Sequence, residues 1–290
     1  MNPAVSHVLL TRFNLPSKGA EATIRAKEGW LRDRVALFER YCLPSVAAQT
    51  DRDFSWLVYV DPQSPAWFLS WADEAGAGLF RAVRRAEVPR EDLLADVAEA
   101  VGGAPARLLT TNLDNDDAVA ADFVARLKAG AAATTPRTAL YLVNGLIRQG
   151  DRLYAHRDPS NAFCSVAEPW DGAVSCWSDW HNRLDRHMPA VRLGGSPGWL
   201  QVVHGTNVSN RVRGTLTSPV PHRALFGSGL DGLPVPGGRE LAADRLLHSP
   251  LRTGREAARA LAKRSVLLVG GPDAVDRMNA LRRRATAGAS

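Results

Sequence analysis

The amino-acid sequence predicts an α/β fold in which a mainly parallel sheet is flanked by helices. Up to about residue 130, short apolar runs typical of buried strands alternate with longer segments whose apolar residues recur at helical spacing. Such alternation is typical of parallel sheets whose strands are joined by helical crossovers. The second half of the chain is richer in Pro and Gly.

The first half supplies most elements of this sheet. Its apolar runs are predicted as strands at 7–13, 54–60, 82–88 and 107–112. Its amphipathic segments are predicted as helices at 30–49, 65–75, 90–101 and 118–129. Gly102-Gly103 ends the third of these helices, as glycine commonly does.

The second half is predicted to be less regular. Strands are expected at 138–144, 146–156 and 199–204, with a hairpin turn at 148–151. Ser178 is a suitable N-cap for a short helix over 178–188. An irregular stretch at 214–240 precedes two segments with helical spacing, 252–264 and 273–285.

The chain length fits one large α/β domain with an extension. We expect the domain to cover residues 1–212, with one half at about 1–117 and the other at about 118–212. Residues 213–290 are expected to form an irregular and helical C-terminal appendage.

Composition narrows the function classes. The net charge is +6, but the basic residues are scattered rather than striped, so nucleic acid is not an expected partner. The three cysteines include no CxxC pair, which argues against a disulfide framework or a cysteine metal site. No stretch approaches the roughly 18 apolar residues of a membrane span, and no signal peptide is recognisable. We expect a cytoplasmic protein, at most peripheral at the inner membrane face.

Three aspartates follow the strand predicted at 107–112. Asp114, Asp116 and Asp117 lie within four positions, where like charges repel one another unless a cation sits among them. Hard carboxylate oxygens suit Mg²⁺ or Mn²⁺, and the carboxyl edge of a parallel sheet is where ligands bind. A divalent ion there would bridge the phosphates of a nucleotide diphosphate. The alternative is a surface turn that caps the following helix.

Several ordered motifs make the sequence resemble a known family. They are Thr11-Arg12-Phe13-Asn14, Trp30-Leu31-x-x-Arg34, Leu37-Phe38-Glu39-x-Tyr41-Cys42-Leu43-Pro44-Ser45, Leu113-Asp114-Asn115-Asp116-Asp117-Ala118 and Trp199-Leu200-Gln201-Val202-Val203-His204-Gly205-Thr206-Asn207. Over about residues 7–212 the chain resembles the bacterial family described as "putative rhamnosyltransferases". The resemblance implies a glycosyltransferase of the GT-A type, with a Rossmann-like nucleotide half and an acceptor half. It also implies a nucleotide-sugar donor and Mn²⁺ or Mg²⁺.

The resemblance assigns the acidic residues to the donor and its metal. Asp114 and Asp116 match the Asp-x-Asp motif, with Asp116 as the firmest metal ligand and Asp114 shared between metal and sugar-nucleotide. His204 is similar in context to a histidine that many enzymes of this fold add to the metal. Its alternative role is that of a core histidine bonded to a backbone carbonyl.

Residues at the end of the first strand are expected to bind the nucleotide. Thr11, Arg12 and Phe13 lie there, and the guanidinium of Arg12 is well shaped for phosphate. Asp61 ends the second strand and would accept a hydrogen bond from a base or ribose. Its alternative is an Asx turn with Pro62.

A transferase that inverts the sugar needs a carboxylate to deprotonate the acceptor hydroxyl. Glu168 and Asp179 are the main candidates for this catalytic base, with Asp171 as a third, and the sequence does not choose between the first two. Trp170, Trp177, Trp180 and Trp199 offer aromatic faces on which an acceptor sugar would stack, although Trp is also a common core residue.

The expected function is therefore metal-dependent transfer of a sugar, rhamnose or another hexose, from a nucleotide-sugar to a glycan, lipid-linked or small-molecule acceptor. One alternative is a degenerate protein that binds nucleotide-sugar or carbohydrate without turnover, which the intact Asp114-x-Asp116 argues against. The other is a nucleotidyltransferase, for which Lys18-Gly19 is a poor imitation of the phosphate loop.

Overall fold

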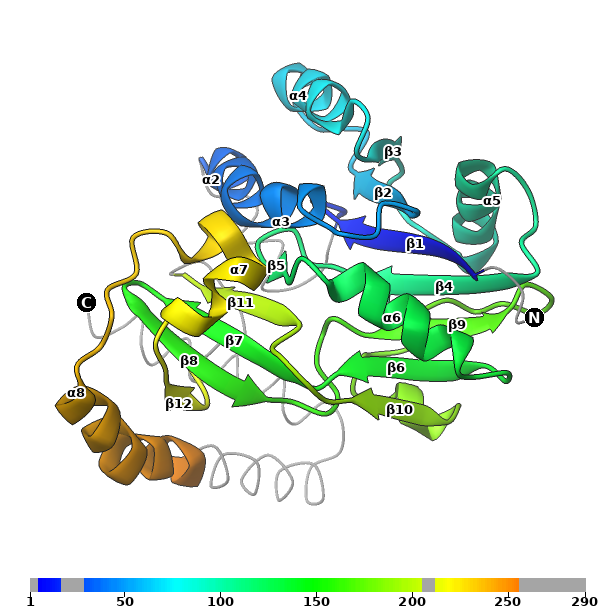
Figure 1. Cartoon of the computed structure of the whole chain (residues 1–290). Coiled ribbons are helices and arrows are strands. Elements are labelled where there is room, and N and C mark those ends of the chain that lie inside the picture. Colours follow the sequence, from blue (N-terminus) through cyan, green and yellow to red (C-terminus); the bar gives the residue numbers. More distant parts are fainter. Residues whose placement is uncertain (1–4, 17–28, 205–211, 256–290) are drawn as a thin grey trace, which may run out of the picture. The chain divides into compact units, whose positions relative to one another are not determined.

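The structure is a computed structural model that describes residues 5–16, 29–204 and 212–255 (Figure 1). The chain divides into two compact units. The large unit takes in the chain up to residue 212 together with 217–235, and the small unit takes in 213–216 together with the chain from 236.

A sheet of seven strands forms the centre of the large unit. Its order is β10-β6-β9-β4-β1-β2-β3. The strands are β1 (Val5–Arg12), β2 (Ser55–Val60), β3 (Arg81–Arg84), β4 (Arg107–Asn112), β6 (Thr138–Leu142), β9 (Ser165–Pro169) and β10 (Ala190–Leu193). Only β9 runs antiparallel to its neighbours among these pairings. The mainly parallel α/β sheet predicted from the sequence is confirmed.

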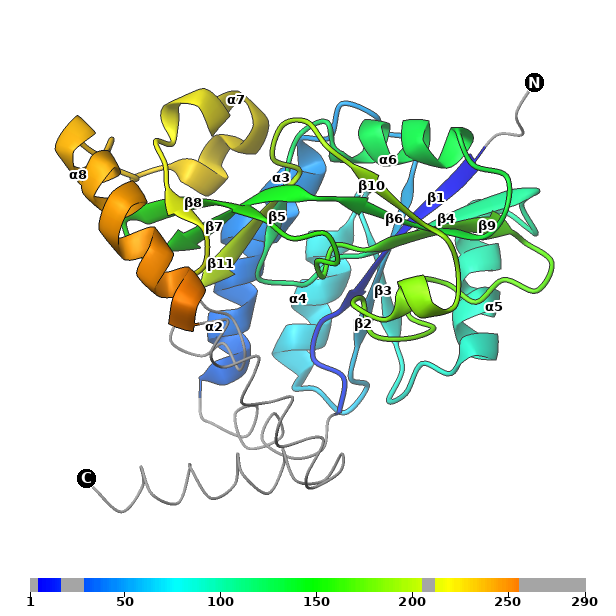
Figure 2. The ribbon, with the colours of Figure 1, turned by 90° about the horizontal axis from the view of Figure 1, so that it is seen from below.

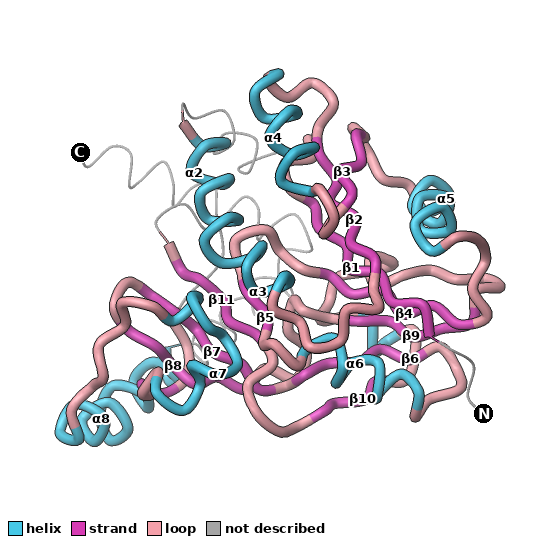
Figure 3. Tube along the Cα trace, turned by 45° about the horizontal axis from the view of Figure 1, so that its top comes forward, coloured by secondary structure: helices cyan, strands magenta, loops and turns pink. Residues whose placement is uncertain are grey.

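Helices cover both faces of this sheet, so its central strands are buried over most of their length. Figure 2 shows α5 (Arg90–Val101) and α6 (Phe123–Ala132) on opposite sides. Helix α4 (Ala66–Gly76) packs near β3. The helix predicted at 30–49 is continuous, as α2 (Trp30–Leu37), a π-helical turn η1 (Phe38–Cys42) and α3 (Leu43–Ala47) (Figure 3).

A smaller sheet lies beside the first within the large unit. Its strands there run in the order β8-β7-β11-β5. They are β5 (Ala118–Val119), β7 (Asn144–Gln149), β8 (Arg152–Arg157) and β11 (Trp199–Val203). Strands β7 and β8 form the hairpin, and Gly150 provides the positive φ of 57° that its turn requires. Strand β11 lies between β7 and β5, so residues near 200 are brought next to Ala118 and Val119, which follow the first half of the chain.

Three boundaries differ from the sequence predictions. The helix predicted from residue 118 begins at Phe123, because Ala118 and Val119 instead pair with β11. The strand predicted at 82–88 ends at Arg84. The helix predicted at 178–188 is reduced to the 3₁₀ turn η2 (Leu184–Arg186).

The segment at 178–188 owes its form to tertiary hydrogen bonds. The carbonyl of His181 accepts a hydrogen bond from the Tyr141 hydroxyl, and its ring nitrogen Nδ1 lies at hydrogen-bond distance from the Ser160 carbonyl. These contacts hold the segment against the sheet and replace the local helical pattern.

Residues 217–235 pack on the smaller sheet. They contain η3 (Val220–His222), α7 (Arg223–Phe226) and η4 (Gly227–Leu230). Phe226 and Leu230 are buried in one cluster with Leu200 and Val202 of β11.

The small unit is organised around Asp244. It contains β12 (Thr215–Leu216), α8 (Gly238–Ala243) and η5 (Asp244–His248), and the helix continues to residue 255. The buried Asp244 carboxylate accepts hydrogen bonds from the Leu216 N–H at 2.7 Å and from Arg252 at 2.7 and 2.8 Å. The predicted helix at 273–285, with its Arg282–Arg284 run, lies outside the described residues. In the part of the chain that the structure describes, no helix has the length and apolar character to cross a membrane.

Candidate active site

The acidic turn, defined here as residues 113–117, lies at the carboxyl edge of the main sheet. It follows β4 directly, and β1 and β2 end at the same edge because all three run parallel. The turn is tied to the end of β1 by backbone and side-chain bonds. Leu113 N–H donates to the Leu10 carbonyl at 3.0 Å, and the Asn115 amide donates to the Phe13 carbonyl at 2.6 Å. This edge is the place where open α/β sheets bind ligands.

Asp116 is the most heavily engaged carboxylate of the turn. Its Oδ2 lies 2.6 Å from Nη1 of Arg34, in the last turn of α2, and 2.9 Å from Nε2 of His204, which follows β11. The residue is only 7% exposed, so both contacts are largely shielded from water. Three segments distant in sequence therefore meet at one oxygen atom.

The other two aspartates point to different partners. Asp117 is buried, and its Oδ1 accepts a hydrogen bond from the Val202 N–H of β11 at 2.8 Å. Its Oδ2 is buried and has no hydrogen-bond partner among the described residues. Asp114 is exposed, and its Oδ1 accepts a 3.3 Å hydrogen bond from the Asn112 amide.

The electrostatics of the three carboxylates differ accordingly. Burial, followed by the charges of Asp116 and Asp114, raises the pKa of Asp117 well above its usual value. Asp114 is exposed, but the surrounding protein partly desolvates it, and this effect and the charge of Asp116 raise its pKa. Burial would also raise the pKa of Asp116, but His204 and Arg34 outweigh it and lower that pKa. Asp116 is thus the carboxylate held ionised.

A second group of side chains lies next to Asp114. The guanidinium of Arg12 stacks over the ring of Trp177 at 4.0 Å. The indole N–H of Trp177 donates to Oδ1 of Asn112 at 2.7 Å, and Asn112 in turn contacts Asp114. Arg12 is exposed and, as expected from the sequence, lies at this edge of the sheet.

The remaining residues predicted to grip the nucleotide have structural contacts. The Thr11 hydroxyl is fully buried, donates to the Leu113 carbonyl and accepts from the indole N–H of Trp56. Phe13 packs in an aromatic cluster with Phe38 and Phe68. The Oδ1 of Asp61 accepts from the Gln63 N–H at 2.8 Å, which is the Asx turn that the sequence left as the alternative.

The two main candidates for the catalytic base are in contrasting environments. Glu168 is fully buried on β9, where its carboxylate accepts hydrogen bonds from Arg137 at 2.7 Å and from the N–H groups of Val174 and Ser175 at 3.0 and 2.8 Å. It pairs in register with Leu108, at the start of β4, whereas the acidic turn follows the end of that strand. Asp179 has a side chain that is 24% exposed and contacts His187 at 2.9 Å.

The donor set at Asp116 suits Mn²⁺ or Mg²⁺ that takes its other ligands from water and a diphosphate. Such ions are commonly held by one or two protein ligands together with substrate phosphates. Asp116 and His204 already meet, and the unpartnered Oδ2 of Asp117 leaves one further buried oxygen close in sequence. Within residues 5–16, 29–204 and 212–255, no group of three or more His, Cys, Asp or Glu side chains is gathered to hold a metal by itself.

Three residues of the site were not assigned a role from sequence. Arg34 and Asn112 contact the acidic turn and Asn115 belongs to it, yet only Arg34 stood in a recognised motif away from the turn. The sequence did contain a pattern that pointed to Asn112 and Asn115. Both are polar residues close to aspartates at the end of a strand, where their amides can hold the aspartate side chains or the turn in place. No local pattern pointed Arg34 toward Asp116.

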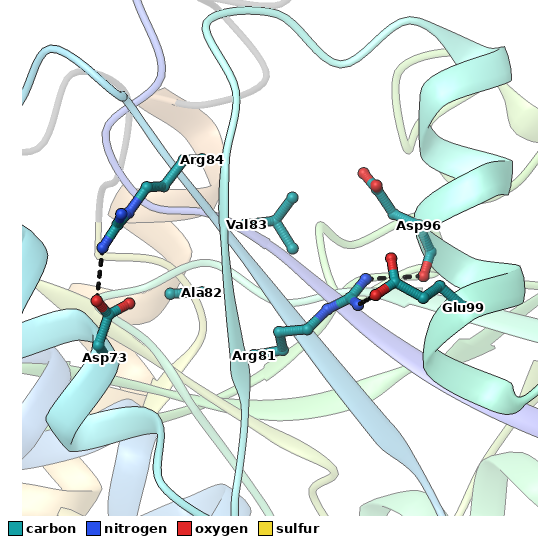
Figure 4. Close-up of a pocket in the computed structure, with 7 residues that line it drawn as sticks. All are labelled: Asp73, Arg81, Ala82, Val83, Arg84, Asp96 and Glu99. Atoms are coloured by element: carbon teal, nitrogen blue, oxygen red, sulfur yellow. Dashed lines mark hydrogen bonds and ion pairs between the residues drawn. The ribbon is translucent and has the colours of Figure 1, made fainter.

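A separate hollow lies at β3, the last strand in the order of the main sheet, between β3, α4 and α5 (Figure 4). Each of its charged side chains has an ion-pair partner, since Arg84 pairs with Asp73, Arg81 pairs with Glu99, and Asp96 pairs with Arg85. It therefore offers no unbalanced charge to a phosphate-bearing ligand, unlike the edge that carries the acidic turn.

Comparison with solved structures finds nucleotide- and sugar-handling enzymes at low similarity. Staphylococcus aureus TarS 1–349 in complex with UDP-GlcNAc is 10% identical, with a TM-score of 0.43, and the alignment covers 72% of this chain and 62% of that one. A putative nucleotide-diphospho-sugar transferase from Desulfovibrio desulfuricans G20 is 9% identical, with a TM-score of 0.35 and coverages of 70% and 82%. A 4-diphosphocytidyl-2C-methyl-D-erythritol synthase is 14% identical, with a TM-score of 0.32 and coverages of 71% and 93%. The chain spans about 60% of the length of the TarS fragment bound to UDP.

No curated protein matches the chain. A family model does match, and it covers residues 6–216, which is most of the chain and includes the acidic turn, Arg34 and His204. The model is described as "Putative rhamnosyl transferase". The resemblance read from the sequence motifs is confirmed: the chain belongs to this family of glycosyltransferases.

Proposed function

We propose that this protein transfers a sugar, rhamnose or another hexose, from a nucleotide-sugar donor to a glycan, lipid-linked or small-molecule acceptor, and that it uses Mn²⁺ or Mg²⁺. The observation that carries the proposal is the meeting of Asp116 and His204 at 2.9 Å, at the carboxyl edge of a parallel sheet. The first residue comes from β4 and the second from β11, so two halves of the domain contribute to one point.

Asp116 and His204 are the proposed metal ligands. When bound, the ion supplies Lewis-acid stabilisation of the charge that develops on the departing diphosphate. Asp116 is suited to this role because its pKa is lowered, so it needs no deprotonation before it binds a cation.

Arg12 and Asp114 are the proposed contacts to the donor. Arg12 is exposed and lies over the ring of Trp177, and the planar fork of its guanidinium matches the oxygens of a phosphate. Asp114 is the exposed carboxylate of the turn and is placed to accept hydrogen bonds from ribose or sugar hydroxyls. Thr11 and Phe13 shape the floor of this region through their packing.

Asp179 is the proposed catalytic base if the transfer inverts the sugar. It is partly exposed, and the Trp180 N–H and then His187 lower its pKa, so it is ionised at neutral pH. An acceptor hydroxyl would give its proton to this carboxylate as the oxygen attacks the sugar. The neighbouring Trp180 side chain is 70% exposed and offers a face on which an acceptor sugar ring would stack.

The test is a thermal-shift screen with a panel of nucleotide-sugars, each with and without Mn²⁺. A donor that binds the native state raises the melting temperature, and the same screen identifies the base and sugar. Asp116→Asn is expected to lose the metal-dependent part of the shift. If no donor stabilises the protein in a metal-dependent way, the proposal is wrong.

Turnover separates the transferase from a protein that only binds. The donor found in the screen is incubated with candidate acceptors, and release of nucleoside diphosphate is measured. Specific binding with no release to acceptor or water would favour the degenerate binding protein. Release of pyrophosphate from a nucleoside triphosphate and a sugar phosphate would favour a nucleotidyltransferase.

A further inference from the structure

Arg34 occupies the same carboxylate oxygen that the proposed metal ion requires. Its Nη1 lies 2.6 Å from Oδ2 of Asp116, and that oxygen also lies 2.9 Å from Nε2 of His204. The same Nη1 donates to Oδ1 of Asn115 at 3.3 Å. The side chains of Arg34 and Asp116 are 13% and 9% exposed, so water competes little for this ion pair.

A guanidinium and a divalent ion compete for a carboxylate oxygen that, like Oδ2 of Asp116, already contacts two side chains. Each is a cation that takes up the same lone pairs, and the two repel each other at short range. Binding of a metal to Asp116 Oδ2 therefore requires Arg34 to withdraw. A buried guanidinium that loses its carboxylate is costly unless another anion receives it.

A diphosphate is the anion best suited to receive Arg34. The planar fork of a guanidinium matches phosphate oxygens, and the pairing is charge-assisted. Arg34 is held near the acidic turn by α2, and its guanidinium lies 5.3 Å from the centre of the Trp30 ring. A small rotation of the side chain thus keeps it at the edge where the donor is proposed to bind.

We propose that Arg34 is the resident cation of Asp116 in the free protein and that it exchanges places with the divalent ion only when a diphosphate arrives. This inference rests on the proposed function. It makes Arg34 a positioning residue that suppresses metal binding in the absence of donor. Metal and diphosphate must then bind cooperatively, each strengthening the other by the same factor.

The experiment measures protein-bound Mn²⁺ by equilibrium dialysis at a buffered concentration of free Mn²⁺, with and without inorganic pyrophosphate. The wild-type protein is expected to bind Mn²⁺ weakly alone and more tightly with pyrophosphate. Arg34→Gln removes the competing cation, so Mn²⁺ alone is expected to bind about tenfold more tightly. This factor is the size of the effect that one neighbouring positive charge commonly has on the pKa of a carboxylate. The enhancement by pyrophosphate shrinks by a similar factor in this variant.

Three further variants serve as controls. Arg32→Gln removes the same charge from the same helix, but Arg32 lies over Trp67 and is expected to behave as wild type. Asp116→Asn is expected to bind Mn²⁺ poorly under both conditions. Arg34→Lys keeps the charge but loses the fork, so Mn²⁺ alone stays weak while the enhancement by pyrophosphate falls. Circular dichroism and melting temperature verify that each variant is folded.

The outcomes separate this inference from the proposed function. Equal Mn²⁺ affinity and equal enhancement in wild type and Arg34→Gln overturn the role of Arg34, while a metal-dependent donor shift would still support the transferase. If no variant retains Mn²⁺ with or without pyrophosphate, and no donor gives a metal-dependent shift, both are wrong.

Discussion

Replacing Glu168 distinguishes a structural carboxylate from a catalytic one. In Glu168→Ala, the N–H groups of Val174 and Ser175 lose their acceptor, and each unsatisfied donor in a shielded site costs about 1–3 kcal/mol. The ion pair with Arg137 adds about 0–1 kcal/mol, because that guanidinium is 35% exposed and regains water. The sum is about 2–7 kcal/mol of unfolding free energy, or on the order of 10 °C in melting temperature for a domain of this size.

The assay pairs thermal or urea unfolding with turnover per folded molecule. Glu168→Gln keeps the shape and one acceptor oxygen, so we expect a smaller loss of about 1–2 kcal/mol. Turnover by the folded fraction should be close to wild type, because Glu168 lies beside the start of β4 and the acidic turn follows its end. A Glu168→Gln protein with unchanged stability and a hundredfold or greater loss of turnover would refute this reasoning and make Glu168 the base.

Three other changes have defined outcomes. Asp179→Asn should lower kcat by about 10²–10⁴ with donor binding and stability unchanged, since a base acts only in the chemical step, and unchanged kcat would exclude this role. Asp117→Asn should raise the melting temperature of the metal-free protein at neutral pH. The pKa of Asp117 is higher in the folded protein than in the unfolded chain, so the wild-type protein loses stability as pH rises from the unfolded pKa to the folded one. The Asn variant does not titrate there, so its advantage in melting temperature over wild type should vanish near pH 4 in a pH series of unfolding curves. Gly145→Ala should destabilise by about 1–3 kcal/mol or more, because a methyl group there overlaps the indole of Trp199, and a near-neutral effect in urea unfolding would contradict that packing.

The fold class was readable because each central strand contains a run of apolar residues that is buried in the sheet. Leu9, Leu57 and Leu109 belong to runs that need cover on both faces, and the helices between them have the matching apolar sides. The smaller sheet was harder to predict. Ala118 and Val119 carry a helix-compatible pattern, and only the arrival of β11, some eighty residues later, makes them a strand.

The acidic turn and His204 were predicted as neighbours, and they are. The strand end that precedes Asp114 and the apolar run that precedes His204 place both at sheet edges. Arg34 was not predicted as a site residue because the direction of a helical side chain depends on how the helix packs, which no local pattern gives. Thr11 illustrates the reverse case, since its hydroxyl meets a backbone partner about a hundred residues away that a sequence pattern does not reveal, whereas the Asx turn of Asp61 was the alternative that the sequence offered.

The hydrogen bond from Val202 N–H to Asp117 spans 85 positions in the chain. Loops of that length close late, after local helices and hairpins have formed. The same closure delivers His204 to Asp116, so the site is completed only when β11 inserts between β5 and β7. During refolding, recovery of a metal response would therefore lag behind recovery of helical structure and would report that the second half has docked on the first.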